Sequence, residues 1–274
     1  MRTGEPEWID FNIERGDIPV KSFDASDNIS PVNSKGYIMM NKVGETTYAQ
    51  MMTGLAELRS KGIKKLIIDL RSNTGGYLGA AIQMVNEFLP KNDLIVYTKG
   101  ARSSISKQFA NGYGHYTTTP LVVLIDESSA SASEIFAGAI QDNDRGTIVG
   151  RRSFGKGLVQ EPIEFSDGSS IRITVARYYT PSGRSIQALG ISPDIVVQQP
   201  EVKPVDPNAP EEEKSAAMKE RSEADLRGAI SNDSMTDEEK RLYQEEQQRA
   251  EESAKLRDED YQLAYAVDII KGLT

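Results

Sequence analysis

The sequence predicts an α/β domain in which helices pack on a mainly parallel sheet. Short apolar runs typical of buried strands recur between residues 36 and 197, and segments with helical spacing separate them. Strands that alternate with helices in this order favour parallel pairing through crossover connections. The 274 residues are 38% apolar, which is enough for a core, and the length permits one large domain or two small ones.

Strands are predicted from runs of aliphatic and β-branched residues or from alternation of apolar and polar residues. Residues 8–20 alternate until Asp17 and Pro19 interrupt the pattern, and Ile171, Ile173 and Val175 alternate near the end of the apolar region. Turn residues join this last strand to the one before it. Strands are therefore expected over 8–20, 36–40, 64–70, 94–98, 121–125 and 147–149, and on both sides of Ser166-Asp-Gly-Ser169.

Helices are predicted where apolar residues recur every three or four positions. Thr46 could cap the first, which places Met51, Leu55 and Leu58 on one face. The last carries an apolar stripe that we expect to dock on a partner surface. The expected ranges are 47–60, 78–89, a small-residue helix from about 131, and a C-terminal segment within 236–274 that Thr236-Asp-Glu-Glu239 opens as a capping box.

Charge divides the chain. Residues 201–274 contain 11 Lys and Arg against 20 Asp and Glu, whereas residues 1–200 contain 21 of each, so the net charge of −9 belongs to the tail. Neither part is a basic surface for DNA or RNA, and no nucleic acid partner is expected. A Pro-, Gln- and Glu-rich stretch after the last strand indicates a linker. Four parts are expected: an extension over 1–35, a core over 36–197, a partly mobile linker over 198–235 and a helical segment over 236–274.

The chain has no cysteine and one histidine, His115. A cysteine nucleophile, disulfides and thiolate metal sites are therefore excluded, and a Ser-His-Asp triad would have to use His115. No cluster of His, Asp and Glu indicates a metal, and no cofactor is expected. No apolar run approaches the ~20 residues that span a bilayer, and Met1 opens no apolar signal segment. We expect a soluble chain, mature or truncated from something longer.

Ser131 is the candidate nucleophile. Its spacing to Glu134 fits a capping box, in which the hydroxyl only accepts a hydrogen bond from the helix's own amides. A helix N-terminus after a buried strand is also where amides converge to stabilise an oxyanion. Gly75-Gly76, directly after another strand, is either a second source of such amides or an ordinary turn that needs positive φ. The local sequence leaves both questions open.

Lys156 is the candidate base, because a serine paired with a lysine needs no histidine. A lysine at an arbitrary position is a solvated surface charge, but Gly155 and Gly157 indicate backbone packed closely around this one. Apolar burial would favour the neutral amine that a base requires, and Gln160 could orient it without adding a charge. Gly150–Lys156 also matches a phosphate-binding loop. A glycine stands where Ser or Thr should bind magnesium, however, and a strand-like run follows, so a nucleotide site is not favoured.

Several blocks, in order, resemble the carboxyl-terminal processing peptidases, also called tail-specific serine proteases. The resemblance covers roughly residues 36–197. The blocks are Asp69-Leu-Arg-Ser-Asn-Thr-Gly-Gly76, Ser129-Ala-Ser-Ala-Ser-Glu134, Gly138-Ala-Ile-Gln-Asp142, Gly150 through Gln160, Asp167-Gly-Ser, Tyr179-Thr-Pro-Ser-Gly and Gly190-Ile-Ser-Pro-Asp194. It implies a crotonase/ClpP-like core of repeated β-β-α units. It also implies Ser131 as nucleophile, Lys156 as base, Gln160 as its partner, and the amides of Gly76 and Ala132 as the oxyanion hole.

The resemblance further implies an endopeptidase of the periplasm or cell envelope that cleaves exported proteins, bound in extended form, near their C-termini. Such peptidases usually carry a PDZ domain before the core, and only residues 8–20 could be the end of one here. In some relatives, helical tails assemble an oligomer. Two other classes stay open: a catalytically silent peptide-binding scaffold, and a crotonase-type acyl-thioester enzyme, although nothing in the sequence marks a coenzyme A pocket.

Overall fold

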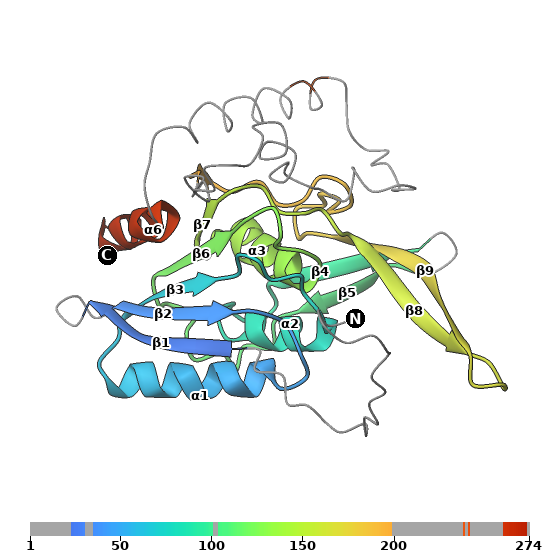
Figure 1. The fold of residues 1–274 in the computed structure, drawn as a ribbon, viewed down its shortest axis with the longest axis horizontal. Helices are drawn as coiled ribbons and strands as arrows, with labels where there is room; N and C mark the ends of the chain where they lie inside the picture. The colour runs from blue at the N-terminus through green and yellow to red at the C-terminus, as the bar shows by residue number, and fades with distance from the viewer. Residues whose placement is uncertain are drawn as a thin grey trace, which may run out of the picture.

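A six-stranded sheet forms the centre of the protein (Figure 1). The computed structural model describes residues 23–30, 35–100, 104–198, 238, 241 and 260–272. Only the β1–β2 pair is antiparallel, and the other neighbours pair in parallel, as predicted. The strands, in their order across the sheet, are β1 (Phe23–Ser30), β2 (Lys35–Met40), β3 (Lys65–Asp69), β6 (Leu121–Ile125), β7 (Thr147–Gly150) and β10 (Ile195–Val196).

Alternate side chains of the central strands point to opposite faces of this sheet. Leu66 and Ile68 belong to the main core with the helices α1 (Thr47–Ser60), α2 (Leu78–Asn86) and α3 (Ala132–Asp142). Ile67 lies in a second cluster on the other face. None of the described helices is long and apolar enough to cross a bilayer.

The helix α6 (Tyr261–Gly272) covers that other face. Its Ala266 and Ile270 are fully buried against Ile67 and its neighbours, and Lys65 Nζ donates to the Ile270 carbonyl at 3.1 Å. The prediction that this stripe docks on a partner surface is therefore wrong for the buried residues. They pack on the chain's own sheet, because β3, β6 and β7 present apolar side chains there.

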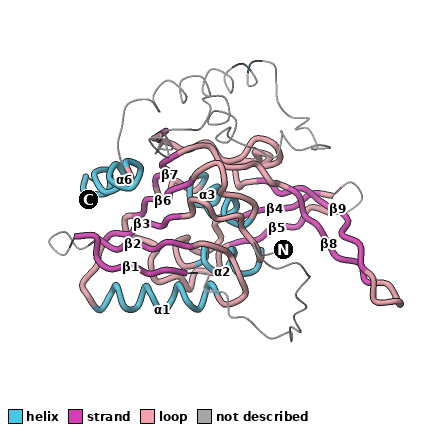
Figure 2. Tube along the Cα trace, in the orientation of Figure 1, coloured by secondary structure: helices cyan, strands magenta, loops and turns pink. Residues whose placement is uncertain are grey.

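A second, antiparallel sheet has the strand order β5-β4-β9-β8. Its long hairpin, β8 with β9, extends away from the body of the molecule (Figure 2). The alternating residues Ile171, Ile173 and Val175 are exposed on it, by 38–46%. The strands are β4 (Leu94–Lys99), β5 (Ser106–Phe109), β8 (Leu158–Glu164) and β9 (Ser170–Tyr179).

Most predicted elements are confirmed within one or two residues. The exception is α2, which ends at Asn86 instead of 89: residues 87 and 88 form a turn, and Leu89 precedes Pro90, which disfavours the helical conformation there. Strands β1, β5 and β10 were not predicted. The strand expected over 8–20, the linker and the capping box at 236–239 fall almost wholly outside the described residues.

Candidate active site

Ser131 lies at a tight turn between the buried strand β6 and helix α3. Its backbone has φ 56° and ψ −111°, a conformation that costs a non-glycine residue of order 1–3 kcal/mol. The turn is held in place at its base. Asp126 Oδ1 accepts the N–H groups of Ser128 and Ser129 at 3.0 Å, and the Ser129 hydroxyl donates to the Leu70 carbonyl at 2.8 Å. Strain of this kind is typical of strand-to-helix turns that present a nucleophilic serine.

Ser131 and Glu134 form the capping box that their spacing predicts. The Glu134 carboxylate accepts the Ser131 N–H at 2.7 Å, so the glutamate's half of the capping box is formed. Ser131 is half-buried at the head of an otherwise buried helix, so it stays accessible, as a nucleophile must be.

The Gly75-Gly76 loop lies against the Ser131 turn. A Cβ added to Gly75 would lie 2.3 Å from the Ala130 carbonyl oxygen and 3.0 Å from Ser131 Cβ, so the two segments touch through the glycine. Asn73 holds the loop: its Oδ1 accepts the Gly75 N–H at 2.9 Å, and its Nδ2 donates to the Met40 carbonyl at 2.6 Å. An Asn that bonds the backbone two residues on is a turn signal that the sequence carried.

Two backbone amides beside Ser131 are unused. Within the described residues, neither the Gly76 N–H nor the Ala132 N–H donates to any acceptor. Ala132 is the first residue of α3, where an amide has no intrahelical partner and the helix dipole favours negative charge. Gly76 is exposed and adopts φ 151°. Neither amide is thus committed to another acceptor in the part of the chain that the structure describes, which the predicted oxyanion hole requires.

Replacing Gly75 with alanine will disrupt this arrangement. The new Cβ would overlap the Ala130 carbonyl and lie 2.8 Å from the Ala132 nitrogen, and φ 84° strains any L residue. We expect a stability loss of about 1–3 kcal/mol from backbone strain, and a drop in turnover on the order of 10²-fold because the Ser131 turn must shift. Thermal melting and peptidase assays measure both. Gly79→Ala in α2, where nothing lies within 4 Å, is the control and should do neither.

The Lys156 loop lies over the same turn. The Phe154 N–H donates to the Ser129 carbonyl at 3.0 Å, and the Lys156 N–H donates to Glu134 Oε2 at 2.9 Å. The Ser131 N–H donates to that same oxygen, so the backbone nitrogens of the candidate nucleophile and candidate base both lie within 3 Å of one atom. The backbones of the two residues, which are 25 positions apart in the chain, thus lie close together in space.

The predicted enclosure of Lys156 is realised only in part. Its side chain is half-buried, and the flanking glycines make room for other backbone: a Cβ on Gly157 would lie 2.3 Å from the Gln187 nitrogen. Gln160 is exposed on β8, where a register shift between Val159 and Gln160 marks a bulge. The chain after Lys156 forms β8 and no helix, so the phosphate-loop interpretation stays disfavoured.

His115 lies away from Ser131. The His115 backbone N–H and imidazole ring both contact Glu87, which caps the C-terminus of α2. Gly76, which lies beside the Ser131 turn, precedes the N-terminus of the same helix. Nine helical residues span about 13 Å. This separation places the single histidine beyond hydrogen-bonding reach of the Ser131 turn.

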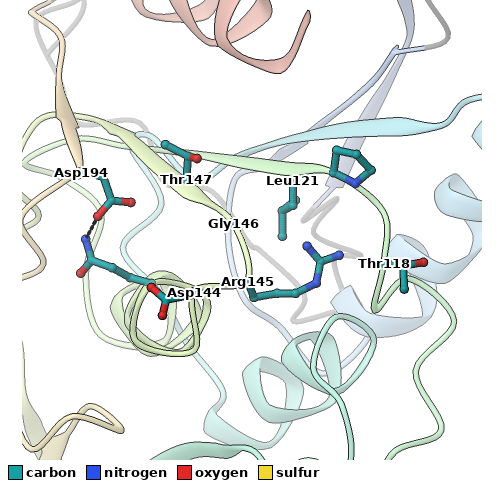
Figure 3. A pocket seen from close by; sticks show the side chains of 9 residues that line it. Thr118, Leu121, Asp144, Arg145, Gly146, Thr147 and Asp194 are labelled. Carbon is teal, nitrogen blue, oxygen red and sulfur yellow. Dashed lines mark hydrogen bonds between the residues drawn. The ribbon is translucent and has the colours of Figure 1, made fainter. Parts of the chain in front are cut away.

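A cavity of about 460 Å³ is lined by residues of β6, β7 and α3 and of the loops beside them (Figure 3). Leu121 and Thr147, which line it, begin the parallel strands β6 and β7, whereas Ser131 follows the carboxyl end of β6. Across it, Gln141 Nε2 donates to Asp194 at 2.6 Å. The cavity therefore opens at the opposite edge of the sheet from the candidate site. Among the described residues, no group of three or more His, Cys, Asp or Glu is placed to hold a metal.

An α/β domain that sets a serine on a strained turn, beside two free amides, has the architecture of a serine hydrolase. Comparison with known proteins narrows the class: the chain belongs to peptidase family S41, whose model matches residues 34–197. The resemblance seen in the sequence is confirmed, because the matched relatives are carboxyl-terminal processing proteases.

The relatives are longer than this chain. The carboxyl-terminal-processing protease of Synechocystis sp. is 45% identical over 174 residues, which are 64% of this chain and 40% of the relative. Protease CtpB of Bacillus subtilis is 35% identical over 201 residues, 73% and 42% of the two chains. A solved photosystem II D1 C-terminal processing protease superposes with a TM-score of 0.57 at 38% identity, over 63% of this chain and 44% of that one. The chain thus spans less than half the length of these relatives.

Proposed function

We propose that this chain is the catalytic part of a Ser-Lys endopeptidase. The Ser131 hydroxyl passes its proton to a neutral Lys156 amine as its oxygen attacks the scissile carbonyl. The Gly76 and Ala132 N–H groups receive the oxyanion of the tetrahedral intermediate. Lys156 then protonates the leaving amine, and water hydrolyses the acyl-enzyme by the same route. Gln160 orients the Lys156 amine.

The observation that carries the proposal is the shared contact at Glu134 Oε2, which draws the Ser131 turn and the Lys156 loop together. Family membership supports a serine-type peptidase. We also infer that residues 36–197 form a crotonase/ClpP-like core of β-β-α units, with 1–35 as an extension, 198–235 as a linker and 236–274 as a helical segment.

The names of the processing relatives support a proposal about substrates, and the resemblance seen in the sequence supports one about the setting. We infer that the whole protein acts on exported proteins near their C-termini, in the periplasm or cell envelope, and binds them in extended form. The C-terminal helical segment would contribute to a homo-oligomer. No observation favours the silent scaffold or the acyl-thioester enzyme over this function.

A labelling experiment tests the proposed function. A fluorophosphonate probe reacts with a serine only when a base and an oxyanion hole activate it. We expect stoichiometric labelling, with the adduct mapped to Ser131 by mass spectrometry, and cleavage of an unfolded test protein that the probe blocks. An inert Ser131 in the folded chain would favour the scaffold instead.

A further inference from the structure

Glu134 is a buried acidic group that the mechanism above does not use. Its side chain is fully buried, and both carboxylate oxygens are occupied. Oε2 accepts the N–H groups of Ser131 at 2.7 Å and Lys156 at 2.9 Å. Oε1 accepts the Ser153 hydroxyl at 2.6 Å and the Gly155 N–H at 2.7 Å. One side chain on α3 therefore holds the nucleophile's backbone and three residues of the lysine loop.

We propose that Glu134 is a positioning residue that fixes the Lys156 loop against the Ser131 turn, and that it does so as a carboxylate. The inference rests on the proposed function, since it assigns the distance between nucleophile and base to this side chain. It also explains how the lysine loop is held in place: backbone N–H groups of the loop bind Glu134, whereas the Lys156 side chain is only half-buried.

The donor count favours the ionised form. All four partners are donors, and an ionised carboxylate offers acceptor sites only. The Ser153 hydroxyl accepts the Ile191 N–H at 2.6 Å and donates its single proton to Glu134 Oε1 at 2.6 Å. A glutamine at this position would turn two N–H donors of its amide toward two of these groups. Charge-assisted bonds to a carboxylate are also stronger than neutral ones.

Titration of Glu134 falls in the neutral range. Burial raises its pKa to about 7, against the hydrogen bonds from Ser153 and from the three backbone amides, which lower it. The carboxylate therefore gains its proton, and the loop loses its charged anchor, as pH falls through about 7. A rate that needs ionised Glu134 is lost in the same direction.

Other ionisable groups lie on the segments packed against Glu134, but none bonds to its carboxylate through a side chain. On the loop, Arg151 pairs with Glu127, and Arg152 donates to the Leu189 carbonyl. On the turn before α3, Asp126 accepts amides of that turn and of Ser72. The Lys156 contact is through its backbone.

The test compares Glu134→Gln with the unchanged chain in three measurements. We expect kcat on a peptide substrate to fall on the order of 10²-fold with KM little changed, since a misplaced base costs that much. On the acid side, log(kcat/KM) should fall less steeply below about pH 7 in the variant than in the unchanged chain, because a glutamine amide does not take up the proton that Glu134 does. Amide hydrogen exchange at residues 153–156 should become faster.

Glu87→Gln is the matched control, because Glu87 is another buried glutamate, 5% exposed, that accepts bonds from Tyr48 and His115. It should leave all three measurements unchanged. If Glu134→Gln does not fold, Ser153→Ala removes one donor and should accelerate exchange at residues 155 and 156 with a smaller loss of kcat. Unchanged exchange, or faster exchange with an unchanged rate and pH slope, would overturn the proposal.

Failure of the proposed function would look different. A chain with no peptidase activity and an inert Ser131 would contradict the endopeptidase itself. The exchange measurement would still show whether Glu134 anchors the loop.

Discussion

Ser131→Ala will abolish cleavage of an unfolded test protein. We expect the cleavage rate to fall by a factor on the order of 10³ or more, as it does when a covalent nucleophile is removed. In the proposed mechanism the acyl-enzyme forms on the Ser131 oxygen, and the amides of Gly76 and Ala132 stabilise only an oxyanion that can no longer arise. Cleavage is followed by gel electrophoresis and by mass spectrometry of the fragments.

The fold should survive this substitution. The turn is held through the backbone contact of Ser131 to Glu134 and through the contact of Ser129 to the neighbouring loop. The melting temperature is therefore expected to stay close to that of the unchanged chain. Ser128→Ala is the control, since Ser128 is an exposed serine of the same turn and should keep full activity. Undiminished cleavage by Ser131→Ala would refute the assignment of the nucleophile.

The central sheet was predictable because its strands are apolar on both faces. Leu121–Ile125 is buried at every position, so the run has no alternative place in the fold. Strand β5 has the opposite character: Ser106–Phe109 is short, polar and exposed, and it forms only because β4 offers an edge to pair with. Its existence depends on a tertiary contact that no local pattern reports.

The candidate site was predictable where chemistry has a local pattern, and not where it depends on contacts far apart in the sequence. Each predicted residue has a local signal: Ser131 stands at a helix start, Gly76 belongs to a glycine pair, and Lys156 has a glycine on each side. Glu134 also has a local explanation, the capping box, and that explanation conceals its bonds to Ser153, Gly155 and Lys156, 19 to 22 residues away. A carboxylate that satisfies one nearby amide gives no sign of three more distant donors.

Lys156→Arg will remove activity almost as completely as loss of the nucleophile. A guanidinium stays protonated throughout the accessible pH range, so it can neither accept the Ser131 proton nor return one to the leaving amine. A lysine amine can do both when it is neutral. We expect turnover and fluorophosphonate labelling of Ser131 to fall together, and raising the pH should restore neither. Stopped assays at several pH values measure this.

The backbone should tolerate the change, because the loop is anchored by main-chain bonds from Gly155 and Lys156 to Glu134 and from Gly157 to Gln187. Lys107→Arg, on the exposed strand β5, keeps the same substitution away from the site and should leave the rate unchanged. Activity of Lys156→Arg within tenfold of the unchanged chain would require another base. His115 is held by Glu87 about a helix length from Ser131, so it is not placed to supply that base.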